Sequence, residues 1–158
     1  MALLNIRKNG DDILRKKCRP VDNITPRILT LLDDMKETLV HANGVGLAAP
    51  QIGVLMRIVI VDNGSELLEL INPVIVKTEG EQEEIEACLS CPGQWGIVKR
   101  PAKVTVTALD RHGKERTYTG EGLTARCFCH ELDHLDGILY IDKAERMLDP
   151  DEIETGEE

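Results

Sequence analysis

Apolar residues along the chain follow first a helical period and then a strand-like one. In residues 25–42, apolar side chains recur every three or four positions, which predicts an amphipathic helix with one buried stripe. Thr25 can cap the first turn, and Pro26 suits the first helical position. Asn43 and Gly44 tolerate the backbone conformation that ends a helix. We therefore predict one N-terminal helix that precedes the strands.

Six short β-rich runs follow this helix, separated by turn residues rather than by further helical segments. Such short connections favour antiparallel pairing. A second helix is expected at residues 123–135, ending at Gly137. We predict a single α+β domain over residues 1–148, with antiparallel sheets packed around the C-terminal helix, and a flexible acidic tail at 149–158. The runs are 56–61, 67–77 with an interruption at 72–73, 83–89, 96–99, 104–109 and 115–119.

Composition narrows the classes of function. The formal net charge of -9 argues against a nucleic-acid-binding protein, which needs a basic face for phosphate contacts. No apolar run approaches the length of a membrane span, and the N-terminal residues do not form an export signal. We therefore expect a cytoplasmic protein without membrane partners. In that compartment the five cysteines are expected to be thiols or metal ligands.

The second helix carries the sequence HELDH at residues 130–134, an HExxH motif. Side chains four residues apart lie on the same face of a helix, so His130 and His134 can bind one metal ion together. Glu131 places a carboxylate beside them, and Cys88 is an upstream candidate for a third ligand. Three protein ligands leave one coordination position open for water, as hydrolytic metal centres require.

Two other metal sites are compatible with these residues. Cys88 and Cys91 have zinc-knuckle spacing, and Cys127 lies one turn before the first histidine, so a closed structural Cys2His2 site is one alternative. A chain of this length does not need a metal to fold, and such a site gives Glu131 no role. A zinc peptidase is the second alternative, and it would use a downstream ligand in place of Cys88.

The glycine-bearing segment 44–53 also has two interpretations. Gly44 and Gly46 can form a tight turn after the first helix, or they can let the backbone approach a ligand closely. In the second case, Gln51 would present an amide N–H to a developing oxyanion.

Three segments together resemble the peptide deformylase family. They are GVGLAAPQ at residues 44–51, EACLS at 86–90 and HELDH at 130–134, in the order and approximate spacing of the family. The resemblance extends from about residue 5 to residue 146. It implies a hydrolase that removes the formyl group from the N-terminal formyl-methionine of new polypeptides and releases formate.

The resemblance also implies roles for individual residues. Cys88, His130 and His134 would bind one divalent metal, Fe(II) in the cell, although zinc, nickel or cobalt suit the same ligands. Glu131 would transfer the proton of the attacking water to the leaving amine. The Gln51 side chain and the Leu89 backbone N–H would stabilise the charge that develops on the formyl oxygen.

Substrate contacts and partners follow from the same resemblance. Leu123 and Cys127, with the ring of His130, would form the walls of a methionine pocket. Gly46 and Gly93 would offer backbone groups to an extended peptide. The expected partners are nascent formyl-methionyl peptides, with transient ribosome contact and no nucleic-acid specificity.

The chain departs from the family pattern at several positions. Ala87 replaces a usual glycine, Cys91 a usual aliphatic residue and Cys129 a common glutamine. The longer C-terminal helix of many bacterial members is missing. Arg126 either makes the mouth of the pocket more polar or lies on the solvent side of the helix, and Trp95 either flanks the groove or packs in the core.

Overall fold

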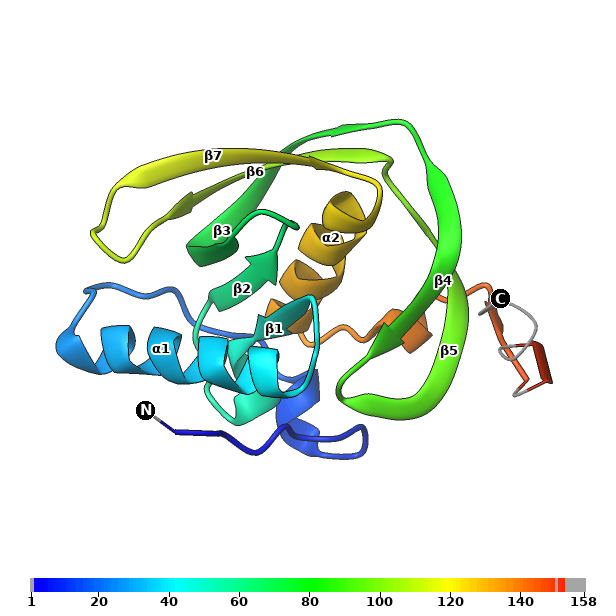
Figure 1. The fold of residues 1–158 in the computed structure, drawn as a ribbon, viewed down its shortest axis with the longest axis horizontal. Helices are drawn as coiled ribbons and strands as arrows, with labels where there is room; N and C mark the ends of the chain where they lie inside the picture. Colours follow the sequence, from blue (N-terminus) through cyan, green and yellow to red (C-terminus); the bar gives the residue numbers. More distant parts are fainter. Residues whose placement is uncertain (1, 150, 153–158) are drawn as a thin grey trace.

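Two antiparallel sheets and two α-helices make up most of the computed structural model, which describes residues 2–149 and 151–152 (Figure 1). One sheet has the strand order β1-β2-β3-β6-β7, and the other has the order β4-β5-β8. All pairings within them are antiparallel, which confirms the predicted α+β class. The elements are η1 Asp12–Arg15, α1 Pro26–His41, β1 Gly46–Ala48, η2 Ala49–Ile52, β2 Ile58–Asp62, β3 Leu67–Glu79, β4 Gln82–Cys88, β5 Cys91–Arg100, β6 Lys103–Leu109, β7 Glu115–Glu121, α2 Leu123–Leu135, η3 Tyr140–Asp142 and β8 Arg146–Met147.

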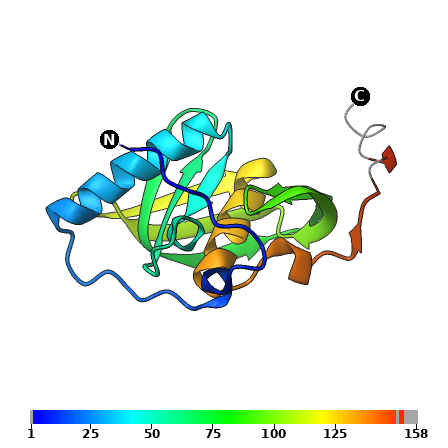
Figure 2. The ribbon, with the colours of Figure 1, turned by 90° about the horizontal axis from the view of Figure 1, so that it is seen from below.

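Helix α1 begins and ends as the sequence predicts. The Thr25 hydroxyl oxygen accepts a hydrogen bond from the Ile28 backbone N–H at 3.4 Å, and Pro26 is the first helical residue. After the last turn, Asn43 has a φ of 54°, the left-handed conformation that commonly follows a helix. Helix α1 packs against one face of the five-stranded sheet (Figure 2).

Strand β2 is buried on both faces because a helix covers each of them. Ile58 and Ile60 belong to the apolar cluster that includes α1, whereas Val59 and Val61 belong to the cluster that includes α2. Side chains alternate across a strand, so an uninterrupted apolar run indicates burial on both sides. The sheet thus carries α1 on one face and α2 on the other (Figure 2).

Helix α2 lies between the five-stranded sheet and the β4–β5 hairpin (Figure 1). It has the predicted bounds, and Gly137 follows it with a φ of 76°. A side chain at Gly137 would collide with the backbone of Arg15, so both conformation and space require glycine there. This placement brings the HELDH segment opposite the end of β4.

The β4–β5 hairpin has a shorter turn than the one left between the predicted runs 83–89 and 96–99. The turn contains only Leu89 and Ser90, while Cys91 begins β5 and pairs with Cys88. A two-residue connection is enough to reverse an antiparallel pair, so Pro92 and the following glycine are not needed for the turn. The hairpin therefore holds Cys88 at a fixed strand end.

Two further differences concern strands. The segment 44–53, predicted only as glycine-bearing, contains β1, which pairs with β2. Strand β3 continues through the expected interruption at Asn72, with a shift in register between Ile71 and Val74. Asn72 has a φ of 52°, and its side-chain amide bonds both backbone polar groups of Val21. The interruption is thus an irregularity inside one strand.

No helix among the described residues is long and apolar enough to cross a membrane. The predicted boundary between a domain at 1–148 and a tail at 149–158 stays a prediction, because residues 150 and 153–158 lie outside the described part of the chain.

Candidate metal centre and active site

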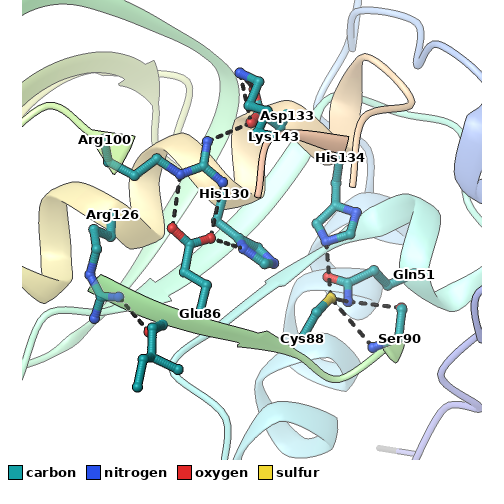
Figure 3. A network of polar contacts seen from close by, with 11 residues as sticks. Gln51, Glu86, Cys88, Ser90, Arg100, Arg126, His130, Asp133, His134 and Lys143 are labelled. Atoms are coloured by element: carbon teal, nitrogen blue, oxygen red, sulfur yellow. Dashed lines mark hydrogen bonds and ion pairs between the residues drawn. The ribbon is translucent and has the colours of Figure 1, made fainter. Parts of the chain in front are cut away.

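Cys88, His130 and His134 converge at one point. One potential ligand atom from each lies within 4.8 Å of the other two, and Cys88 Sγ lies 3.4 Å from His134 Nε2 (Figure 3). Cys88 comes from the end of β4, whereas both histidines come from successive turns of α2. The three predicted ligands are therefore brought together by a hairpin and a helix that are far apart in sequence.

A buried carboxylate orients the first histidine. Glu86 Oε1 lies 2.9 Å from His130 Nδ1, and Arg100 donates to both carboxylate oxygens at 2.9 and 3.0 Å (Figure 3). Arg100 also donates to Asp133 at 2.7 Å. Only 6% of Glu86 and 4% of Arg100 are exposed, so the two charges compensate each other away from water.

The ionisation of Glu86 determines which nitrogen of His130 is free. Burial raises the pKa of Glu86, but the hydrogen bonds from His130 and Arg100 outweigh burial and lower that pKa to about 2. An ionised Glu86 accepts a hydrogen bond from Nδ1–H, which leaves the Nε2 lone pair available to a metal. The ring of Tyr140 stacks on the imidazole at a centroid distance of 5.8 Å and further fixes its plane.

The surroundings of Cys88 suit a thiolate that is held by a cation. The sulfur faces two donors, the Ser90 backbone N–H at 3.4 Å and Gln51 Nε2 at 3.6 Å. The hydrogen bond with Cys91, burial and the nearby Glu131 carboxylate nevertheless raise the pKa of Cys88. A bound metal cation would supply the missing positive charge, so the three residues fit a metal site.

Glu131 is the second buried carboxyl group at this point. It is 4% exposed, and its Oε1 has no hydrogen-bond partner among the described residues. Burial is the main cause that raises its pKa to about 7. A carboxyl group of this kind can accept and return a proton near neutral pH. A Cβ atom at Gly46 would lie 2.6 Å from Glu131 Oε2, so glycine allows β1 to approach this carboxyl group.

The Gln51 amide has a fixed orientation. Its oxygen accepts a hydrogen bond from the Ala48 backbone N–H at 2.9 Å. Its Nε2 donates to the Ser90 hydroxyl oxygen at 3.0 Å and points toward Cys88. The η2 turn thereby directs one amide N–H of Gln51 toward Cys88, at the convergence of the three ligands, where it could serve a negatively charged oxygen.

A cavity of about 420 Å³ opens beside these groups. It is bounded by residues from β1, the β4–β5 hairpin and α2, and all predicted substrate contacts line it. Leu123, predicted as a wall of the methionine pocket, is 54% exposed and lines the cavity. Arg126 and the half-buried Trp95 also line it, so both side chains belong to the cavity wall. The predicted residues that line it are Gly46, Gln51, Cys88, Leu89, Gly93, Leu123, Cys127, His130 and Glu131.

The other cysteines are not members of the ligand group. Among the described residues, the group contains Cys88 but neither Cys91 nor Cys127. Cys127 Sγ donates instead to the Val45 carbonyl oxygen at 3.6 Å. The geometry therefore offers three protein ligands and not the four that a closed Cys2His2 site needs.

Sequence reasoning missed Arg100 and the roles of Glu86, Ser90 and Tyr140. In the sequence, Glu86 is only the first residue of the EACLS motif, and Arg100 lies at the end of a strand, where a charged residue usually faces water. A charged residue in a strand is a weak signal, because its burial depends on which partner the fold places opposite it.

Arg100→Ala would leave Glu86 buried without its guanidinium. We expect the free energy of unfolding to fall by about 3–5 kcal/mol, as for other broken buried ion pairs. Urea denaturation followed by circular dichroism measures this loss. Arg116→Ala is the matched control, because Arg116 pairs with Asp110 at the surface and should cost far less. Equal losses in the two variants would contradict the structural importance of the buried pair.

Comparison with known proteins agrees with this geometry. A family model described as Polypeptide deformylase matches residues 3–149. A peptide deformylase of Acetivibrio thermocellus is 59% identical over 158 residues, covering 100% of this chain and 93% of that protein. One of Thermoanaerobacter pseudethanolicus is 58% identical over 158 residues, covering 100% of this chain and 99% of that protein.

Solved structures show the same likeness. The peptide deformylase from Thermotoga maritima superposes with a TM-score of 0.89 at 35% identity, covering 92% of this chain and 99% of that chain. The peptide deformylase from Legionella pneumophila gives a TM-score of 0.87 at 43% identity, covering 99% of this chain and 92% of that chain. Since the family model and the relatives span almost the whole sequence, the chain belongs to the polypeptide deformylase family.

Proposed function

We propose that Cys88, His130 and His134 bind the single metal ion with which this chain removes the formyl group from N-terminal formyl-methionine. Members of the family are metal-dependent hydrolases with this activity. The observation that carries the residue assignment is the convergence of one thiol and two imidazoles within 4.8 Å, beside the buried Glu131 carboxyl group. This grouping combines a metal site with a proton acceptor.

We propose Fe(II) as the ion in the cell. One thiolate and two imidazoles also suit zinc, cobalt and nickel, so these ions are expected to replace iron in vitro. An ion at this site supplies Lewis acidity and lowers the pKa of a water molecule bound to it.

Glu131 is the proposed proton carrier of the reaction. Its carboxyl group is adjacent to the ligand group, and its pKa of about 7 allows it to be ionised or protonated near neutral pH. It would accept a proton from the attacking water and then donate it to the amine that leaves as the amide bond breaks. Formate and a peptide with a free N-terminus are the products.

Gln51 and Leu89 are the proposed donors to the formyl oxygen. Gln51 Nε2 is held in place by its contacts with Ser90 and by the Ala48 N–H on its oxygen. The Leu89 backbone belongs to the two-residue turn that follows Cys88 and lines the same cavity. One donor placed against a developing oxyanion typically contributes roughly 3–4 kcal/mol to lowering the barrier.

The cavity is the proposed binding site for the methionyl peptide. Leu123 and Cys127 would contact the methionine side chain, while Gly46 and Gly93 would present backbone to the extended peptide. A formyl carbon carries only a hydrogen, so a narrow site can accept it and exclude an acetyl group. Transient contact with the ribosome and action in the cytoplasm are further proposals, because nascent polypeptides are the substrate.

Glu131→Gln tests the proton transfer. The amide cannot accept a proton, so we expect kcat for formate release from formyl-Met-Ala-Ser to fall by about 10²–10⁴-fold. The assay is anaerobic, and metal content is measured on the same samples. Glu84→Gln, at an exposed position on β4, is the control and should retain full activity.

Two results of that assay would contradict different statements. An unaffected Glu131→Gln variant would remove Glu131 from the mechanism. A metal-loaded wild-type protein that releases no formate would exclude deformylation by this chain.

Cys88→Ala and its neighbour Cys91→Ala test the ligand assignment. We expect one metal ion per chain in the wild type and in Cys91→Ala, but far less than one in Cys88→Ala, because only Cys88 lies in the ligand group. Elemental analysis after anaerobic purification gives these ratios. Full metal in Cys88→Ala would favour a peptidase-like site with a ligand elsewhere, and loss in Cys91→Ala would favour a closed site with two thiolates.

A further inference from the structure

Arg126 places a positive charge in the wall of the substrate cavity. It lies on α2 four residues before His130, so the two side chains project from the same face of the helix, one turn apart. The side chain is half-buried and lines the cavity together with Leu123 and Cys127. Among the described residues that line this cavity, no other is a lysine or an arginine.

The guanidinium of Arg126 is held in place but retains N–H donors without a hydrogen-bond partner among the described residues. Its Nη1 donates to the Ile85 carbonyl oxygen on β4 at 2.7 Å (Figure 3). Its Nε is buried and has no hydrogen-bond partner among the described residues. A guanidinium has five N–H donors in a fixed plane, so a group anchored by one such bond retains donors for a ligand.

The charge of Arg126 is also uncompensated in the described part of the chain, where it forms no ion pair. The arginines at 100 and 111 each contact two carboxylates. Glu86, which lines the same cavity, is already bound by Arg100. The cavity therefore contains a positioned cation that forms no ion pair with either carboxyl group of the surrounding wall, Glu86 or Glu131.

We propose that Arg126 is a specificity-determining residue, which makes this deformylase favour peptides with an acidic side chain in the two residues after formyl-methionine. The spacing supports this position. One helical turn advances about 5.4 Å, and an extended peptide advances about 3.3 Å per residue. A peptide with its formyl group near His130 thus reaches the level of Arg126 one to two residues later.

This inference rests on the proposed function. The direction of the predicted preference, for acidic over basic peptides, distinguishes it from an effect of the overall charge. The chain has a formal net charge of -9, which by itself repels acidic peptides and attracts basic ones. A preference for an acidic peptide would therefore be opposite to the effect of the overall charge and would point to a local cation.

The test compares formate release from formyl-Met-Glu-Ser, formyl-Met-Lys-Ser and the neutral formyl-Met-Ala-Ser. For the wild type, we expect kcat/KM to be about two- to fivefold higher for the Glu peptide than for the Lys peptide, the range of a partly exposed ion pair. Arg126→Leu should reduce the ratio to one or below, Arg126→Lys should retain part of it, and high salt should weaken it. Arg27→Leu, an equal charge change at an exposed position of α1, should leave the ratio unchanged.

A ratio of one in the wild type would overturn the proposal. A ratio that Arg126→Leu leaves unchanged would overturn it as well, and an equal loss on all three peptides would mean that Arg126 only braces β4 through Ile85. Release of formate from the neutral peptide is read separately, so failure of the proposed function is distinguishable from failure of this inference.

Discussion

The candidate site depends on one buried ion pair, between Glu86 and Arg100. The pair joins β4 to β5, and its extensions to His130 and Asp133 attach both strands to α2. Buried charges are costly unless each finds its partner in good geometry, so this set of contacts permits few relative positions of the hairpin and the helix. The same constraint sets the tautomer of His130 and the distance of Cys88 from both histidines. Glu86 and Arg100 thus both attach the hairpin to α2 and determine which nitrogen of His130 is free for a metal.

The five-stranded sheet packs around α2 and helps to hold it against the β4–β5 hairpin. Val59 and Val61 pack beneath α2, so the helix cannot retreat from the hairpin without exposing apolar surface. Two of the departures from the family pattern, Cys91 and Cys129, lie in apolar clusters. Cys129 is 7% exposed within the cluster under α2, and Cys91 is 2% exposed beside Tyr140. Cys129 acts there as a small apolar side chain, whereas Cys91 also contacts the Cys88 thiol.

Local signals in the sequence were sufficient to predict much of the fold and the three side chains that converge on α2 and the end of β4. Caps and helical periodicity located α1 and α2, and the spacing of His130 and His134 placed them on one face. Strand β1 has only three residues, too few for a pattern, and β5 begins at residues that usually mark a turn. The role of Arg100 required knowledge of which charge lies opposite it, which is a property of the tertiary structure. The orientation of Gln51 likewise depends on Ser90, a contact across 39 positions of sequence.

The proposed coordination of the metal consists of three protein ligands and one open position. X-ray absorption spectroscopy of the anaerobically purified, metal-loaded protein tests it most directly, because scattering distinguishes sulfur from nitrogen and oxygen in the first coordination shell. The proposed coordination predicts one sulfur, two imidazole nitrogens and at least one oxygen from solvent. A shell with two sulfurs and two imidazoles, and without a solvent oxygen, would contradict it.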